Sequence, residues 1–342
     1  MAAGLVVLGG LGLLLIVLPT SHHIKIVRVL PANANTVAPH ASLTNAVGAP
    51  AAPTAPDPRK LAKTKHASTA APASEGEAGG SVLRSGASGS FSSLATRLGG
   101  RIELAVAPLG AGSTQVLGED TPAHGWSTTK VPVLVALLKA RGGEGLTAAE
   151  TTWAHAAITE SDNQSVLDLF GDLEHLEGGL GGASAYIQEL FRSSGDAQTA
   201  VSTAPPPAGA VTTFGQTEWS PGEAVKFFRA LALGCLLPSQ ETGYVLGLMQ
   251  SIESSESWGL GSAGLPAVAF KGGWGPEATG GYLVRQSGII DVGSKSGVAV
   301  SIVAYPSSGS FGSGTQMLTE TASWLRQELR LVPRTATGCS GE

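Results

Sequence analysis

The pattern of apolar and polar positions divides this chain of 342 residues into segments of different character. Residues 1–20 are almost wholly apolar and carry no charge. Their length is close to the roughly 20 residues that a helix needs to cross a bilayer, so we expect a signal peptide or a membrane anchor. Residues 21–88 are rich in Ala, Pro, Ser and Thr and show no sustained apolar period. Such a segment buries too little surface to offset its ordering entropy, and we expect a disordered Ala/Pro-rich linker.

The pattern over residues 89–332 predicts one folded domain. Apolar residues recur at helical spacing across 127–252, whereas alternating, β-rich runs stand before and after this stretch. The expected strands span 101–109, 114–117, 266–274, 281–290 and 297–305. This order predicts an α+β fold with an antiparallel sheet of about five strands from both chain ends, flanked by helices, and an inserted all-helical subdomain. We expect residues 333–342 to form a flexible tail.

Charge restricts the classes of partner and location. The formal net charge is -5 and the Lys and Arg residues are scattered, so nucleic acid is not an expected partner. No basic residue precedes the apolar N-terminal run, whereas Lys25 and Arg28 follow it. By the positive-inside tendency this order leaves the remainder in the cytoplasm. We instead expect a start site further upstream and an extracytoplasmic, monomeric protein that is secreted or anchored to the membrane.

The chain has two cysteines, Cys235 and Cys339, and the second lies in the expected tail. Two cysteines are too few for a disulfide framework. We therefore expect two free thiols, although export would allow them to pair.

Ser127 and Lys130 stand three residues apart at the predicted start of a helix, in the sequence Ser-Thr-Thr-Lys. Side chains at positions i and i+3 share a helix face, so the hydroxyl and the amine can form a hydrogen bond. A lysine whose pKa is lowered by burial or by a second cation can take the serine proton and make the hydroxyl a nucleophile. The alternative is a serine near a helix N-terminus beside a solvated lysine, because so short a motif also arises by chance.

A second motif, Ser161-Asp162-Asn163, precedes an apolar helical run. The Ser161 hydroxyl can relay a proton to a leaving nitrogen. The Asn163 amide can bind a substrate carbonyl and fix Lys130. Ser, Asp and Asn are also the residues of ordinary helix caps, and this alternative stays open.

A third motif, Lys271-Gly272-Gly273, ends a predicted strand. A cation and two glycines at a strand edge suit the binding of a substrate carboxylate. Lys295 begins a rival motif, Lys-Ser-Gly. It is expected in the turn between the last two strands, away from a site in the middle of the sheet, and we choose Lys271 for this reason.

In this order the three motifs resemble the signature of class A β-lactamases and penicillin-binding proteins, which is Ser-x-x-Lys, Ser-Asp-Asn and Lys-Thr-Gly. The resemblance covers residues 90–332 and implies a sheet domain with a helical insertion and an active site between them. It implies that Ser127 is acylated and that Lys130 and Ser161 move protons. The residues to which it assigns substrate binding are Asn163, Lys271, Gly273 and Trp274. It further implies an oxyanion hole made of the backbone N–H groups of Ser127 and Trp274.

The sequence departs from this signature at three places. Gly272 lacks the hydroxyl of the middle residue of the third motif, and Trp274 is bulky where the family has a small residue. The loop sequence Glu-x-x-Leu-Asn, whose Glu activates the deacylating water in class A enzymes, is missing. The corresponding region holds two carboxylates, Asp196 and Glu218. We expect Glu218 to serve as a charge at the N-terminus of the helix that begins near Pro221.

We therefore expect a serine hydrolase that forms a Ser127 acyl-enzyme with a β-lactam or a peptidoglycan-derived peptide and deacylates slowly. The alternatives are a D,D-peptidase and a non-catalytic cell-wall-binding domain that retains the cleft. No cofactor is expected. Nor is a metal, because the histidines form no ligand-spaced motif such as His-Glu-x-x-His. We interpret His124 as a loop residue and not as a base.

Overall fold

The computed structural model describes residues 81–207, 210–277, 281–335 and 337–339. The expected signal peptide or anchor and most of the expected linker lie outside the described residues. Val82 and Leu83 are buried, and Leu83 forms a β-bridge with Leu329. The folded domain therefore begins before residue 89, because these apolar residues cover the same core as the C-terminal helix. Within the described part of the chain, no helix combines the length and apolar character needed to cross a bilayer.

The five strands form one antiparallel sheet with the order β2-β1-β5-β4-β3. The strands are β1 (Gly100–Pro108), β2 (Gln115–Leu117), β3 (Ala269–Pro276), β4 (Tyr282–Ile290) and β5 (Val298–Pro306). Both ends of the chain thus contribute to the sheet, which confirms the predicted fold class. Strand β3 lies at an edge of the sheet and has one row of backbone groups without a strand partner.

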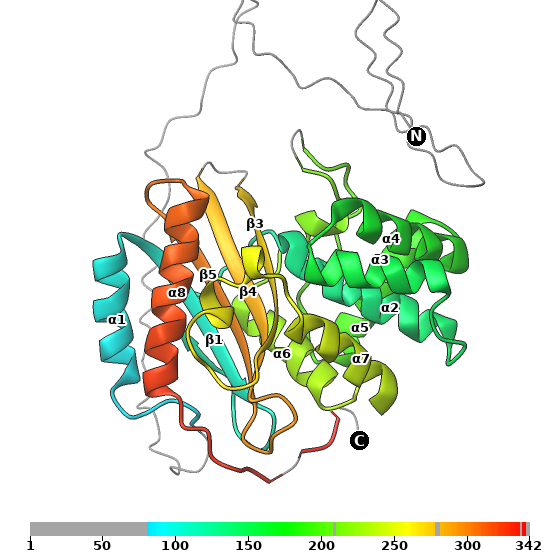
Figure 1. Cartoon of the computed structure of the whole chain (residues 1–342). Helices are drawn as coiled ribbons and strands as arrows, with labels where there is room; N and C mark the ends of the chain where they lie inside the picture. The colour runs from blue at the N-terminus through cyan, green and yellow to red at the C-terminus, as the bar shows by residue number, and fades with distance from the viewer. Residues whose placement is uncertain (1–80, 208–209, 278–280, 336, 340–342) are drawn as a thin grey trace, which may run out of the picture. The chain divides into compact units, whose positions relative to one another are not determined.

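Each face of the sheet covers a separate apolar core. Successive side chains of a strand point to opposite faces, and on β1 Leu104 and Val106 join one core while Ala105 and Ala107 join the other. Helices α1 (Ala87–Leu98) and α8 (Phe311–Glu328) pack on the first face, and α6 (Pro221–Ala232) packs on the second (Figure 1). The sheet is therefore buried on both sides, and its central strands carry almost no exposed residue.

An all-helical part is inserted between β2 and β3, as the sequence predicted (Figure 1). Its helices are α2 (Lys130–Arg141), α3 (Ala148–Thr159), α4 (Asn163–Glu177), α5 (Leu180–Ser193) and α7 (Ser239–Gln250). The first nine residues of α2 are all buried. A helix that is apolar on every side lies inside a bundle, so α2 is fixed by its neighbours and holds the residues at its N-terminus in place.

The C-terminal segment differs from the expected flexible tail with a free thiol. Cys235 and Cys339 form a disulfide. The Arg334 backbone N–H donates to the Lys295 carbonyl, and Arg229 donates to the Thr337 hydroxyl. The described residues of this segment are thus fastened to the domain. The two cysteines are 104 residues apart in sequence, and only the folded chain brings them together.

Candidate active site

A cavity of about 270 Å³ opens where β3 meets the helical part. Four of the seven site residues predicted from the sequence line it: Ser127, Ser161, Asn163 and Trp274. The other three, Lys130, Lys271 and Gly273, lie behind its wall, where each is buried. The remaining described residues of the lining are Trp126, Ala210, Val211, Thr212, Glu256, Gly275, Pro276 and Tyr282.

Ser127 lies in a 3₁₀ turn, η1 (Trp126–Thr129), that leads directly into α2. Strand β3 packs tightly against this turn. A Cβ atom at Gly273 would stand 2.9 Å from the Ser127 backbone nitrogen. A Cβ atom at Gly275 would stand 2.3 Å from the Trp126 ring. Only glycine allows so close an approach, so both glycines bring the nucleophile candidate up to the strand.

Two residues of the site hold left-handed backbone conformations that non-glycine residues adopt at a cost in energy. The φ angle is 47° at Trp126, immediately before Ser127, and 58° at Ser161. Residues held in such conformations cluster at functional sites, where the surrounding structure over-determines them. At Ser161 the strained backbone ends the loop after α3, and the next residue, Asp162, caps α4 by accepting a hydrogen bond from the Ser165 N–H. The helix cap that the sequence left as an alternative therefore exists at Asp162, while Ser161 faces the cavity.

The Lys130 amine is buried and donates to the Ser161 carbonyl and, over 2.9 Å, to Asn163 Oδ1. Burial and, to a smaller extent, the nearby Lys271 cation lower its pKa to about 7. A neutral amine has two N–H donors and one lone pair. Both donors are engaged by these two oxygens, so the lone pair is left to accept a proton.

The Ser127 hydroxyl forms no hydrogen bond with any described residue, and so the direct Ser127–Lys130 hydrogen bond expected from their spacing is not formed. The Lys130 amine instead donates to the two oxygen acceptors of the second motif. Catalytic hydrogen bonds are often long without substrate and tighten when it binds. The two side chains nevertheless start from one turn of backbone, because the Lys130 N–H donates to the Ser127 carbonyl.

Lys271 is fully buried and has no donor left for a ligand. Its three N–H groups point to Ser161 Oγ at 2.8 Å, Glu256 Oε2 at 3.1 Å and the Gly272 carbonyl at 3.2 Å. Burial lowers the pKa of Lys271, and the Glu256 carboxylate opposes this shift. The Lys271 amine is therefore directed at Ser161, Glu256 and its neighbouring backbone, and its role in binding a substrate carboxylate stays a prediction.

Glu256 is the residue of this site that the sequence did not reveal. It ends a short 3₁₀ turn, η3 (Ser254–Glu256), and its side chain is 12 % exposed. It lies 15 residues before Lys271 in a segment without a recognisable motif. Only the contact with Lys271 in the folded chain identifies it.

The region in which class A enzymes carry their loop Glu supplies no carboxylate to the cavity from its described residues. Asp196 is buried and accepts from the Thr199 N–H and from Trp219 Nε1, which makes it a structural residue. Glu218 is exposed and pairs by its backbone with His124. The acidic residue in the first turn of α6 is Glu223, and Glu218 lies two residues before the N-cap Ser220; its expected role as a helix-terminal charge stays a prediction.

His124 does not line the cavity. Its Nδ1 lies 3.3 Å from Glu277 Oε1. Among the described residues, no group of three or more His, Cys, Asp and Glu side chains is close enough to hold a metal ion.

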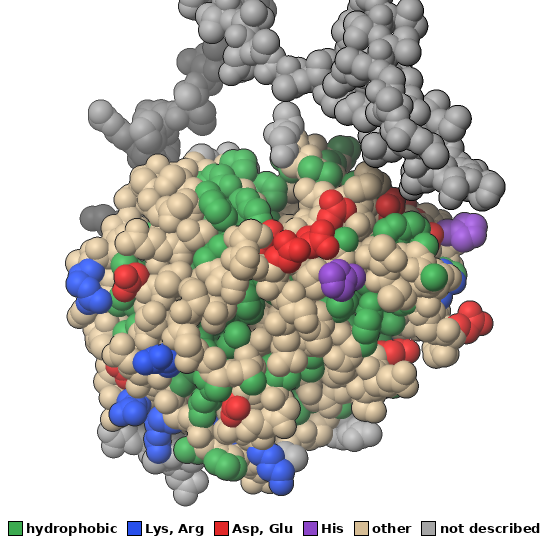
Figure 2. Space-filling view, viewed as in Figure 1, with side chains coloured by type: hydrophobic (Ala, Val, Ile, Leu, Met, Phe, Trp, Pro, Cys, Tyr) green, Lys and Arg blue, Asp and Glu red, His purple; other side chains and the backbone are tan. Residues whose placement is uncertain are grey.

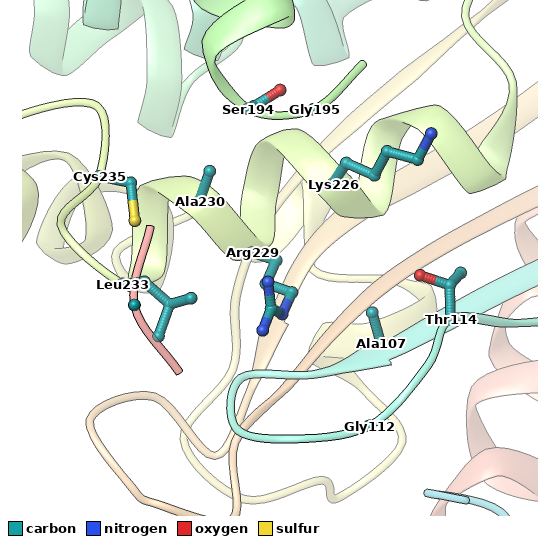
Figure 3. Close-up of a pocket in the computed structure, with 11 residues that line it drawn as sticks. Ala107, Gly112, Thr114, Ser194, Gly195, Lys226, Arg229, Ala230, Leu233 and Cys235 are labelled. Carbon is teal, nitrogen blue, oxygen red and sulfur yellow. The ribbon is translucent and has the colours of Figure 1, made fainter. Parts of the chain in front are cut away.

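A second cavity, of about 290 Å³, lies beside the disulfide (Figure 3). Two cations, Lys226 and Arg229, reach it from α6. Arg229 already donates to the Pro108 carbonyl, and Lys226 is paired with Glu223. No serine in its lining has a lysine placed as Lys130 is, so this cavity is the weaker candidate for chemistry.

Comparison with known proteins supports the fold. No protein-family model matches the chain, and no curated protein matches its sequence. Solved structures do match. An ancestral class A β-lactamase (GNCA) has 22% identity and a TM-score of 0.55, and the match covers 70% of this chain and 99% of that one. The chromosome-encoded β-lactamase of Vibrio parahaemolyticus has 17% identity and a TM-score of 0.56, with 70% and 98% covered.

The class A β-lactamase of Mycobacterium abscessus has 18% identity and a TM-score of 0.55, with 70% and 98% covered. The matched share of each of these structures is almost its whole length. The domain therefore has the class A β-lactamase fold, as the order of its three motifs indicated.

Proposed function

We propose that this protein is a serine hydrolase that is acylated on Ser127 by a β-lactam or a peptidoglycan-derived peptide. One observation carries the proposal: a buried lysine with a pKa of about 7 and an unengaged lone pair lies one helical turn from a serine that faces a cavity. The class A β-lactamase fold of the domain supports it, as does the contact of the Lys130 amine with the second motif beside Ser127.

In the proposed reaction, Ser127 Oγ attacks the substrate carbonyl carbon and its proton passes to Lys130 Nζ. A C–O bond forms and the carbonyl oxygen gains negative charge. The backbone N–H groups of Ser127 and Trp274 would stabilise this charge, because the turn and strand β3 are in contact here. Collapse of the intermediate breaks the C–N bond.

The leaving nitrogen takes the hydroxyl proton of Ser161, which recovers a proton from the Lys130 ammonium. Lys271 suits this relay because it donates to Ser161 Oγ and leaves the hydroxyl hydrogen free to be donated. Each proton that leaves Ser127 is thus returned to the leaving group, and Lys130 ends neutral.

Deacylation is proposed to be slow. A water that attacks the acyl-enzyme needs a base on its own side of the ester. Glu256 is the one carboxylate among the described lining residues, and it is bound to Lys271. The acyl-enzyme would therefore accumulate.

The test is incubation with a fluorescent penicillin followed by mass measurement of the intact protein. We expect one adduct on the wild type, no adduct on Ser127→Ala, and an unchanged adduct on the control Ser93→Ala, whose serine is exposed on α1. An adduct that survives Ser127→Ala would refute the assignment.

Release of terminal D-Ala from a short peptide would identify the D,D-peptidase alternative. Binding of wall fragments without any adduct would identify the non-catalytic one.

We also propose that the domain works outside the cytoplasm, secreted or anchored through its N-terminal apolar segment. The disulfide between Cys235 and Cys339 supports this location, because disulfides persist in oxidising compartments. Protease treatment of intact cells, with detection of the domain, tests it.

A further inference from the structure

The charge of the proposed acylation site differs from what a carboxylate-bearing substrate requires. Glu256 is the one charged side chain among the described residues that line the cavity, whereas Lys130 and Lys271 lie behind the wall. Figure 2 shows acidic side chains gathered where the sheet meets the helices, while the lysines and arginines visible on this face lie toward its margins. A substrate anion placed there would meet a carboxylate first, and juxtaposed like charges oppose binding.

The hydrogen bonds of Lys271 remove the cation that would bind an anion. An ammonium has three donors, and those of Lys271 are engaged by Ser161, Glu256 and the Gly272 carbonyl. A substrate carboxylate would have to displace Glu256 from a fully buried ammonium. Glu256, in contrast, has capacity left: among the described residues no donor other than Lys271 reaches its carboxylate.

The place that a side chain at position 272 would take is also occupied. A Cβ atom at Gly272 would stand 2.9 Å from Trp258 Cη2 and 3.0 Å from Cζ2, so the indole occupies the place of a hydroxyl-bearing side chain. The Trp258 and Trp274 rings lie 6.0 Å apart, and Phe311 lies 5.0 Å from Trp274. Trp274 lines the cavity together with Glu256. Aromatic rings attract cations, and a carboxylate in the same cavity adds to this attraction.

We propose that the acyl substrate of this site carries a cationic group, such as an ammonium, in place of a carboxylate beside the scissile carbonyl. Glu256 binds this group and Trp274 flanks it. The inference rests on the proposed acylation of Ser127, and it makes Glu256 the residue that determines specificity.

The test uses three forms of benzylpenicillin that differ only at the carboxylate: the free acid, the methyl ester and the 2-aminoethyl ester. Acylation rates are measured by intact mass. We expect the aminoethyl ester to react fastest and the acid slowest, with about a tenfold difference between neighbours in this order, since one charge pair changes at each step. Glu256→Gln is expected to speed the acid about tenfold and to slow the aminoethyl ester. The matched control Glu253→Gln, an exposed neighbour outside the cavity lining, keeps the wild-type order.

The inference would be overturned if the free acid reacted fastest with the wild type, or if Glu256→Gln left the order of rates unchanged. Either result would leave the proposed acylation intact. If none of the three compounds acylates the protein, the proposed function fails. Calorimetric binding of the same three compounds to Ser127→Ala then decides the inference separately. The same order of affinity upholds it, and equal affinity or no binding rejects it.

Discussion

Lys130 and Lys271 are both buried lysines, but their hydrogen-bond partners give them different chemistry. Lys130 contacts a carbonyl and an amide oxygen, which carry no charge, and burial together with the nearby Lys271 lowers its pKa to about 7. Burial also lowers the pKa of Lys271, but the Glu256 carboxylate that it contacts opposes this shift. One amine is thus suited to exchange a proton near neutral pH, whereas the other is held in an ion pair.

The pH dependence of acylation follows from Lys130. The amine must be neutral to take the Ser127 proton, and it is protonated below its pKa of about 7. We therefore expect the acylation rate to rise about tenfold per pH unit up to this value and to level off above it. The measurement is the rate of labelling by a fluorescent penicillin from pH 5 to pH 9.

Two variants sharpen this prediction. Lys130→Arg stays charged throughout the range, and we expect a loss of about 100-fold or more at every pH. Lys271→Met removes a cation that lowers the Lys130 pKa, so the midpoint should move to higher pH. A flat profile in the wild type would exclude Lys130 as the base.

At the scale of elements, the glycines of strand β3 leave room for other segments to pack closely against the strand. Gly273 and Gly275 make room for the turn that carries Ser127, and Gly272 makes room for Trp258, which precedes the 3₁₀ turn η4 (Gly259–Gly261). Gly272, at which the sequence departs from the family signature, is therefore matched by Trp258 from another segment. A single substitution at either partner breaks this match.

Restoring a hydroxyl at position 272 tests the match between Gly272 and Trp258. We expect Gly272→Ser to lower the free energy of unfolding by about 1–3 kcal/mol, because the new Cβ overlaps the indole. The double variant Gly272→Ser with Trp258→Leu should recover most of this loss. Urea unfolding measures both, and tryptophan fluorescence reports whether the indole moves. Equal stability of Gly272→Ser and the wild type would contradict this packing.

At the scale of the whole molecule, the disulfide joins the helical part to the C-terminal segment that follows α8. It closes a loop of about a hundred residues, and closing such a loop in the unfolded chain is worth about 5 kcal/mol. We expect Cys339→Ser, or reduction of the wild type, to lower the free energy of unfolding by about that amount.

The acylation rate should be unchanged by this loss, since Cys235 lines the second cavity and not the one that contains Ser127. Urea unfolding with and without reductant, alongside the labelling rate, is the measurement. Unaltered unfolding, or a labelling rate that falls with the disulfide, would contradict the separation of the two sites.

The order of the elements, and the residues that this order was expected to bring together, could be predicted from the chain alone. Strand alternation, helical periodicity and short motifs are local patterns, and they placed Ser127, Ser161 and Asn163 at element ends that the fold brings to one cavity. Topology also separated Lys271 from Lys295, because the strand order was readable along the chain.

The distribution of charges could not be predicted in this way, because it depends on contacts in the folded chain. The pairing of Glu256 with Lys271, the indole over Gly272 and the bond between Cys235 and Cys339 join residues that no local pattern connects. Hydrogen-bond partners and burial depend on distances between segments remote in sequence, and these set which amine is neutral and which group faces a ligand.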